Sequence, residues 1–240
     1  MQKLVFQDCP NITYIDKTTT AIEKIHVHKC PNLVDYVGNI NRAYLVINQH
    51  NYSDYIDWVG LQSGEKITID VSDTFTIPSK IKSNSIKING ASLPSILNIE
   101  LSERSYQSLS DVSITECVSK HDSPSKINVL RTSNDVGVNS LSIFGSAIDE
   151  VEISVSKIGT FCAMNSDISK LPESVKEYGE LDLRGTSISE LPTDITVSKL
   201  LIKDTKISYL PNIFNAGKSA HIHADFESLC NAVSYPFIYN

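Results

Sequence analysis

Two histidine pairs are the first residues in this chain whose type and spacing could support chemistry. His26 and His28 lie two residues apart, and so do His221 and His223. Residues two apart in a strand point to the same face, so each pair could offer two imidazole nitrogens to a metal ion. The pairs lie near opposite ends of the chain, where they could not share one ion. We interpret them as surface histidines and predict no metal site.

Other reactive residues lack the partners that catalysis requires. Gly217-Lys218-Ser219 is similar to the end of a phosphate-binding loop, but Asn212 stands where that motif needs a glycine. Glu180 and Asp182 would share one strand face, and a glycosidase needs two carboxylates that flank a sugar. A solvated acidic pair is the simpler interpretation. We therefore predict that the protein is not an enzyme and binds no cofactor.

Composition narrows the classes of partner. The 240 residues carry 28 acidic and 21 basic side chains, which gives a formal net charge of −7. This balance argues against a general nucleic-acid-binding surface, because phosphates attract basic proteins. With 41% hydrophobic residues the chain can bury a sizeable core. No segment approaches the roughly 20 apolar residues of a membrane span.

Three Leu-Pro dipeptides show that the chain is repetitive. Leu171-Pro172, Leu191-Pro192 and Leu210-Pro211 recur at intervals of 20 and 19 residues, and each ends the same apolar pattern. Such recurrence predicts coils stacked side by side around a continuous core. The aligned apolar positions are Val138, Leu141, Ile143, Ile148 and Val151; Ile158, Phe161, Ala163, Ile168, Leu171 and Val175; Tyr178, Leu181, Leu183, Ile188, Leu191 and Ile195; and Val197, Leu200, Ile202, Ile207 and Leu210.

The N-terminal half repeats less regularly. Residues 4–12 match residues 25–33 at a shift of 21, and Ala220, Ile222, Phe226 and Leu229 continue the pattern at the other end. Alternating apolar residues predict strands in between, and the spacing around Ile127 implies two short coils of 15 and 14 residues. The stretch from Leu97 to Leu109 predicts an extra strand or an insertion. The expected strands are Leu45–Asn48, Ile67–Asp70, Ile86–Asn89, Val112–Thr115 and Ile127–Leu130.

The five cysteines show no paired spacing, which is typical of reduced intracellular thiols. Cys9 and Cys30 would stack in adjacent coils, within reach of a disulfide, although buried free thiols are the simpler expectation. The remaining cysteines have no histidine or acid at a recognisable catalytic spacing. The start of the chain shows no secretory signal peptide, so we expect a cytoplasmic protein.

The residues from Tyr178 to Pro192 resemble the leucine-rich repeat family, whose consensus reads L-x-x-L-x-L-x-x-N-x-L-x-x-L. The short period with Leu-Pro endings is similar to bacterial effectors of the YopM and IpaH type, and the Cys-Pro-Asn segments resemble BspA-type repeats. The resemblance implies an α/β solenoid of about 11–12 short irregular coils, with one parallel β-sheet and few helices. It implies one domain over 1–240, with irregular coils over 1–137, regular 19–20-residue coils over 138–230 and a cap or tail over 231–240.

Serine, threonine, cysteine or aspartate replaces the consensus asparagine in this chain, so we expect no regular asparagine ladder. We expect no catalytic part of the IpaH type. By analogy the family implies a bacterial, phage or viral binding protein, such as an effector or inhibitor in a host cytoplasm.

One column of residues on the outward sheet face forms the predicted partner-binding site. Leu130, Phe144 and Met164 would be consecutive in that column and would form an apolar ladder on a face expected to be wet. Cationic residues follow directly, and outward strand positions carry a formal excess of about four positive charges, which favours an acidic partner surface. The predicted site consists of Leu130, Phe144, Met164, Arg184, Lys203 and His223.

We therefore predict a non-enzymatic module that binds a protein partner, with no nucleic acid and no membrane. One alternative is a right-handed parallel β-helix that binds or cleaves glycans, which would show three strands per coil and a carboxylate-lined groove. Another is a structural subunit that self-associates through its end coils. The sequence leaves open the partner, the oligomeric state, and whether the tail around Phe237-Ile238-Tyr239 caps the last coil or covers the sheet.

Overall fold

The computed structural model describes residues 3–12, 14–15, 24–28, 35–36, 44–49, 61–62, 66–71, 77, 79–83, 85–101, 110–120, 122–131, 138–211 and 221–223. Within these residues the regular structure consists of β-strands and contains no α-helix. Among them, accordingly, no helix is long and apolar enough to cross a membrane. The predicted tail over 231–240, the loop at 217–219, Cys30 and Cys230 lie outside the described residues.

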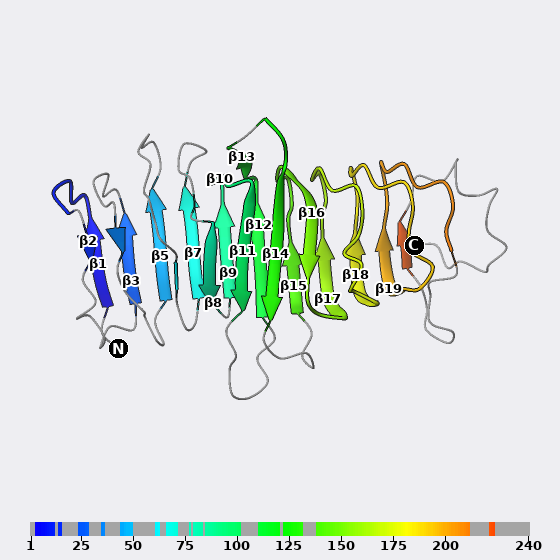
Figure 1. Ribbon diagram of the computed structural model, residues 1–240, viewed down its shortest axis with the longest axis horizontal. Helices are drawn as coiled ribbons and strands as arrows, with labels where there is room; N and C mark the ends of the chain where they lie inside the picture. The colour runs from blue at the N-terminus through cyan, green and yellow to red at the C-terminus, as the bar shows by residue number, and fades with distance from the viewer. Residues whose placement is uncertain are drawn as a thin grey trace.

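Most of the strands form one long parallel sheet, here called the main sheet. Its 11 strands follow one another in chain order from the N-terminal end to the C-terminal end, as Figure 1 shows. In sheet order the strands are β1 (Lys3–Gln7), β3 (Lys24–His28), β5 (Tyr44–Gln49), β7 (Lys66–Val71), β9 (Ser85–Asn89), β12 (Ser110–Thr115), β15 (Val138–Ser142), β17 (Lys157–Cys162), β18 (Glu177–Asp182), β19 (Thr196–Leu201) and β20 (His221–His223).

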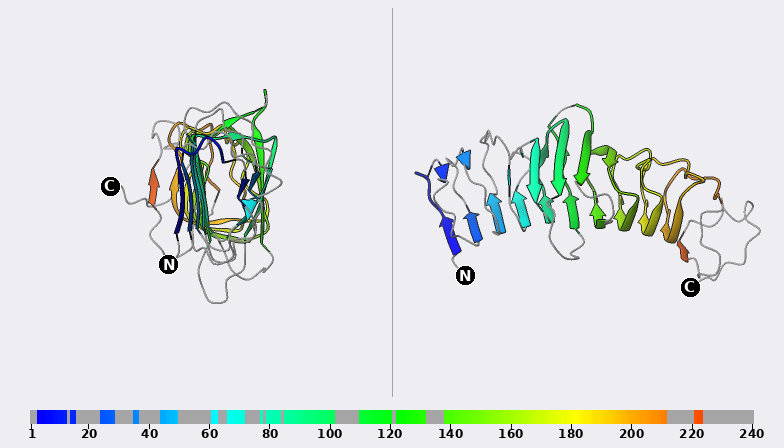
Figure 2. Two further views of the ribbon diagram at one scale, coloured as in Figure 1. Left: turned by 90° about the vertical axis from the view of Figure 1, so that its left-hand side faces the viewer. Right: turned by 60° about the horizontal axis from the view of Figure 1, so that its bottom comes forward.

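A second parallel sheet of five strands faces the middle of the main sheet, so the expectation of a single sheet is wrong. Its strands, in sheet order, are β16 (Ile148–Ile153), β14 (Ser125–Arg131), β11 (Ile96–Leu101), β8 (Lys80–Ser83) and β6 (Leu61–Gln62). Two further parallel pairs join β10 (Ser92–Leu93) to β13 (Val118–Ser119) and β2 (Tyr14–Ile15) to β4 (Asp35–Tyr36). Figure 2 shows the two larger sheets as opposite walls.

Aliphatic side chains from both walls fill the space between them. On the second sheet Leu97, Ile99 and Leu101 alternate with outward residues, as a strand with one buried face requires. On the main sheet Ile67 and Ile69 do the same, each with no exposed surface. Each circuit of chain covers the apolar side of its neighbours, so one core runs along the row.

The predicted repeat of the C-terminal half is confirmed position by position. Ile158 pairs with Tyr178 and Tyr178 with Val197, so the first apolar residues of three repeats lie side by side. All the aligned apolar residues from Val138 to Ile207 are buried, and Leu210 packs partly against the core. The N-terminal shift of 21 is also confirmed, because Leu4 pairs with Ile25 and Phe6 with Val27.

The two short coils predicted around Ile127 are one long circuit. Val112 pairs directly with Leu141 on the main sheet, and Ile127 lies on β14 of the second sheet, beside Leu97. Strand period alone does not say which sheet a strand joins, which explains the error. For the stretch from Leu97 to Leu109 an extra strand or an insertion was predicted, and the structure places a strand, β11, over Ile96–Leu101.

The turn after each main-sheet strand has one conformation throughout the described circuits. The residue at the bend has a positive φ, and it is a glycine in three circuits and an aspartate, asparagine or glutamate in the others: Asp8, Gly90, Glu116, Gly145, Asn165, Gly185 and Asp204. Glycine adopts this left-handed conformation at no steric cost, and Asn and Asp tolerate it better than most residues do.

The residue after the bend holds the turn locally. The hydroxyls of Ser166, Thr186 and Thr205 donate to the carbonyl oxygen three residues earlier, at 2.7, 2.7 and 2.8 Å. These bonds close each turn on itself rather than linking neighbouring circuits. Ser146 differs, because its hydroxyl lies 3.1 Å from both the Ile114 carbonyl oxygen and the Cys117 nitrogen of the preceding circuit.

Candidate binding surfaces

Four of the six predicted partner-binding residues lie in successive circuits. Phe144, Met164, Arg184 and Lys203 occupy the turn position that follows each strand of the main sheet. The Gly145 N–H donates to the Met164 carbonyl at 2.9 Å. In the same way the N–H of Asn165 donates to the Arg184 carbonyl at 2.8 Å, and that of Gly185 to the Lys203 carbonyl at 3.0 Å. Adjacent strands lie about 4.8 Å apart, so neighbouring side chains in this row can touch. We call these four residues the turn-edge row.

Leu130 does not belong to this row, and its assignment is corrected. It lies on β14 of the second sheet, where it pairs with Glu100, on the opposite wall of the molecule. Its side chain is 55% exposed there. The turn-edge row instead continues from Phe144 to Thr115, because β12 and β15 are neighbours. The predicted apolar ladder of three residues is therefore a pair.

His223 is also displaced from its predicted position. Ile222 pairs with Leu200 and His223 with Leu201, whereas the prediction aligned Ile222 with Ile202. His223 therefore lies two residues out of the turn-edge row, level with Asp182. The segment before β20 departs from the 19–20-residue period, so extending that period placed the strand incorrectly.

Polar side chains border the row on its N-terminal side. Asn89 donates to the Asp70 carboxylate at 3.0 Å, and Thr115 donates to the Asn89 side-chain oxygen at 2.9 Å. These three residues occupy adjacent strands in the same column as Phe144. The column thus changes from a hydrogen-bonded polar ladder to half-buried Phe144 and Met164.

Two cations on the outward face pair with acidic neighbours. Arg184 donates two bonds to the Asp182 carboxylate, at 2.9 and 2.6 Å, and Asp182 holds the pKa of this guanidinium above its usual value. Lys199 lies 3.0 Å from the Glu180 carboxylate. Lys126, which was predicted to be one of the outward cations of the main sheet, lies on β14 of the second sheet. Without Lys126 the predicted excess falls from about four positive charges to about three, since Asp182 and Glu180 were already subtracted in it.

The candidate catalytic groups are held in structural contacts. Asp182 is not solvated as predicted, because its side chain is only 8% exposed beneath Arg184. Burial raises the pKa of the Cys117 thiol to about 11, and burial likewise raises that of Cys162. Such thiols are poor nucleophiles at neutral pH. Within the described ranges no three His, Cys, Asp or Glu side chains come close enough to hold a metal ion.

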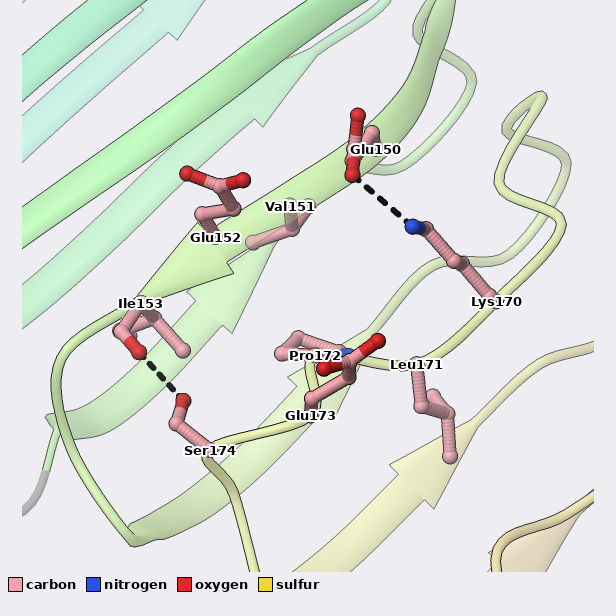
Figure 3. Close-up of a pocket in the computed structure, with 9 residues that line it drawn as sticks. All are labelled: Glu150, Val151, Glu152, Ile153, Lys170, Leu171, Pro172, Glu173 and Ser174. Carbon is pink, nitrogen blue, oxygen red and sulfur yellow. Dashed lines mark hydrogen bonds and ion pairs between the residues drawn. The ribbon is translucent and has the colours of Figure 1, made fainter.

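A cleft lies where the second sheet ends, and the sequence analysis did not identify it. It has a volume of about 360 Å³ and separates β16 from residues 170–174 of the next circuit. Figure 3 shows Glu150 and Glu152 on the β16 side, with Lys170 and Glu173 facing them. The sequence signal was the change from alternating Val151 and Ile153 to Leu171-Pro172, which ends the strand pattern.

Ion pairs bridge this cleft and extend to Lys126 on the neighbouring strand β14. The Lys170 ammonium lies 3.0 Å from the Glu150 carboxylate, and Lys126 lies 3.5 Å from the other oxygen of the same group. Lys126 also bonds Glu152 at 2.5 Å. The hydrogen bond from Lys170 is the main reason why the pKa of Glu150 lies below its usual value.

Comparison with protein families, with curated proteins and with solved structures finds no match to this chain.

Proposed function

We propose that the chain is a solenoid related in pattern to the leucine-rich repeat family. The support is the pairing of Tyr178, Leu181 and Leu183 with the equivalent residues of neighbouring circuits, at the spacing of the L-x-x-L-x-L consensus. In three C-terminal circuits a hydroxyl, of Ser166, Thr186 or Thr205, closes the left-handed turn after the strand and takes the place of the consensus asparagine. Two middle circuits depart from this pattern and are closer to a parallel β-helix, because each contains three strands, β9 to β11 in one and β12 to β14 in the other.

We infer that the protein is a non-enzymatic binding module that grips a protein partner at the turn-edge row. The observation that carries this proposal is the placement of Phe144 and Met164 beside Arg184 in three successive circuits. Apolar side chains next to an arginine form the composition typical of binding hot spots. A row built on stacked strands is also rigid, which lowers the entropic cost of binding.

The partner surface should offer an apolar contact next to a carboxylate. Two guanidinium donors of Arg184 already bind Asp182, and an arginine has five N–H donors, so others remain to face a partner. Lys203, in the next circuit, is exposed. A carboxylate placed between the two would gain a charge-assisted bond without displacing Asp182. We place the protein in the cytoplasm, in keeping with its free Cys9, Cys117 and Cys162.

The test compares two changes of the same kind on opposite walls. Tagged protein is used to capture partners from a lysate of candidate host cells, and captured proteins are quantified for the wild type, Phe144→Ser with Met164→Ser, and Leu130→Ser. We expect the double variant to lose one specific partner at least tenfold. Leu130→Ser removes an exposed apolar side chain from the second sheet and should capture as the wild type does.

Circular dichroism and thermal melting must show that all three proteins are folded, since Phe144 and Met164 are half-buried. Equal capture by the double variant and the wild type would refute the proposal. Loss on Leu130→Ser alone would move the interaction to the second sheet.

The glycan-cleaving alternative has partial support. Circuits with three strands and a cleft lined by Glu150, Glu152 and Glu173 are the two features that it requires. A general acid, however, needs a raised pKa, and the pKa of Glu150 is lowered by Lys170. Glu152 is also paired, with Lys126. These pairs favour binding over hydrolysis at this cleft.

A further inference from the structure

The outer edge of β16 is unpaired in the described part of the chain. β16 is the last strand of the five-stranded sheet, and its one strand neighbour is β14. The Ser154 N–H donates to the Val129 carbonyl, which lies on the β14 side. Backbone groups alternate along a strand, so those of Val151 and Ile153 point to the other edge. The Ser174 hydroxyl, which donates to the Ile153 carbonyl from across the cleft, confirms this direction.

Three backbone groups on this edge consequently lack a hydrogen-bond partner among the described residues. They are the N–H and C=O of Val151 and the N–H of Ile153. Strand edges of this kind can pair with another chain, and many proteins block them. Here the following circuit supplies no strand, because residues 170–174 form turns and irregular chain rather than a ladder.

An extended chain that enters the cleft beside this edge displaces two contacts that bridge it, the Lys170–Glu150 ion pair and the Ser174 bond to the Ile153 carbonyl. The volume of the cleft, about 360 Å³, lies within the range of ligand clefts, roughly 300–1,000 Å³. β16 has six residues, and a strand of that length spans about 20 Å. Leu171 and Pro172 form the far wall, both buried or nearly so.

The two faces of β16 would place different kinds of side chain next to an added strand. Val151 and Ile153 point into the core, while Glu150 and Glu152 point outward. A strand added here would continue both rows, with its inward side chains against Leu171 and its outward ones beside the glutamates. The cleft lining contains three glutamates and one lysine, and Lys126 of β14 pairs with two of these glutamates, so the formal charge of the whole group is −1. Outward basic residues and inward aliphatic residues would match it.

We propose that the cleft beside β16 binds an extended segment of a partner protein with alternating basic and aliphatic side chains, which adds to the five-stranded sheet as a sixth strand. Main-chain hydrogen bonds to Val151 and Ile153 would hold the segment, and Glu150 and Glu152 would select its basic residues. This site lies on the opposite wall from the main sheet and is independent of the turn-edge row.

The first experiment measures binding of labelled hexapeptides to the full chain by fluorescence polarisation. The probe is Lys-Val-Lys-Val-Lys-Val, and the comparison peptide replaces each lysine with glutamate. We expect the basic peptide to bind at least tenfold more tightly. Backbone N-methylation of either the lysines or the valines removes the amide donors of one strand edge. If the peptide binds parallel to β16, N-methylation of its lysines should abolish binding. If it binds antiparallel to β16, N-methylation of its valines should abolish binding.

The second experiment changes the site itself. Val151→Pro removes the outward N–H and leaves the bonds to β14 intact, and proline is tolerated on such edges. It should weaken binding at least tenfold, and Glu150→Gln with Glu152→Gln should do so too. The matched control is Glu190→Gln, because Glu190 occupies the position of Lys170 one circuit later, away from the cleft. Circular dichroism establishes that each variant is folded.

Three outcomes would overturn the proposal. The basic peptide could fail to bind at millimolar concentration. N-methylation of the lysines and N-methylation of the valines could both leave binding unchanged, which would mean that charge alone attracts the peptide. Sedimentation of the protein without peptide could reveal a dimer that Val151→Pro dissociates, which would assign the edge to a second copy of this chain.

Discussion

The middle of the molecule and its C-terminal part build the same main sheet from circuits of different length. In the middle, residues in equivalent positions are separated by 26 residues from Asn89 to Thr115 and by 29 from Cys117 to Ser146. In the C-terminal part the separation is 20 from Lys157 to Glu177 and 19 from Glu180 to Lys199. These long circuits supply β11 and β14 at the centre of the second sheet, whereas its outer strands β6, β8 and β16 come from circuits of 22, 19 and 20 residues.

The difference shows that one wall of the core can be either a sheet or a row of turns. In the long circuits, Leu97, Ile99 and Leu101 cover the core through strand alternation. In the short circuits Leu171 and Leu191 do so with single side chains followed by proline. The cleft lies at the change from one solution to the other, because β16 has no strand to pair with in the next circuit.

The largest expected effect tests whether the core packs equally well against the second sheet and against the turns of the short circuits. Ile99 has no exposed surface within a complete sheet, whereas Leu171 is 5% exposed and borders the cleft. We expect Ile99→Ala to lower the free energy of unfolding by about 4 kcal/mol and Leu171→Ala by about 2 kcal/mol, since the chain beside the cleft can relax into the space. Urea denaturation followed by circular dichroism measures both. Equal losses would show that the turns pack as tightly as the sheet.

The second prediction concerns a glycine at a close approach between two of the short circuits. A Cβ on Gly179 would lie 2.5 Å from the Gly159 carbonyl oxygen, a backbone atom that cannot move aside easily. β9 and β12 of the long circuits contain no glycine. We expect Gly179→Ala to destabilise the protein by about 2 kcal/mol. Ser198→Ala, at the same position one circuit later, is the control and should change stability by less than about 0.5 kcal/mol.

The third prediction concerns a polar group inside the short circuits. The Tyr178 hydroxyl is buried and has no hydrogen-bond partner among the described residues, and burial raises the pKa of this phenol above its usual range. We expect Tyr178→Phe to raise the free energy of unfolding by about 1 kcal/mol, because it removes an unpaired polar atom and keeps the ring contact with Phe161. Thermal melting measures the change. A clear loss of stability would mean that the hydroxyl is hydrogen-bonded in solution.

The smallest effect is a pH dependence at the boundary between the two regions. Lys170 lowers the pKa of Glu150 from its ordinary 4.5. A lowered pKa in the folded state stabilises the protein above the ordinary value, and this contribution is lost as the pH falls through the folded-state pKa. Between about pH 5 and pH 3 the melting temperature should fall slightly more for the wild type than for Lys170→Met. Identical slopes would mean that the pair contributes nothing.

Much of the core was predictable because short-range periodicity reports which side chains turn inward. The repeat from Val138 to Ile207 was assigned correctly at every position. The site was less predictable. Phe144 and Met164 were placed correctly beside Arg184, whereas Leu130 was not, because a strand on either wall has the same alternating pattern.

The sequence by itself determined which residues of the C-terminal circuits face the core, because this depends on local spacing and on the Leu-Pro turns. It did not determine where the regular period ends, since β20 lies 22 residues after its partner position on β19. Only the tertiary structure decided which sheet each strand of the long circuits joins. That choice depends on pairing between segments 26 to 29 residues apart. The tertiary structure also decided that the second sheet stops at β16, and this end of the sheet creates the cleft and its unpaired edge.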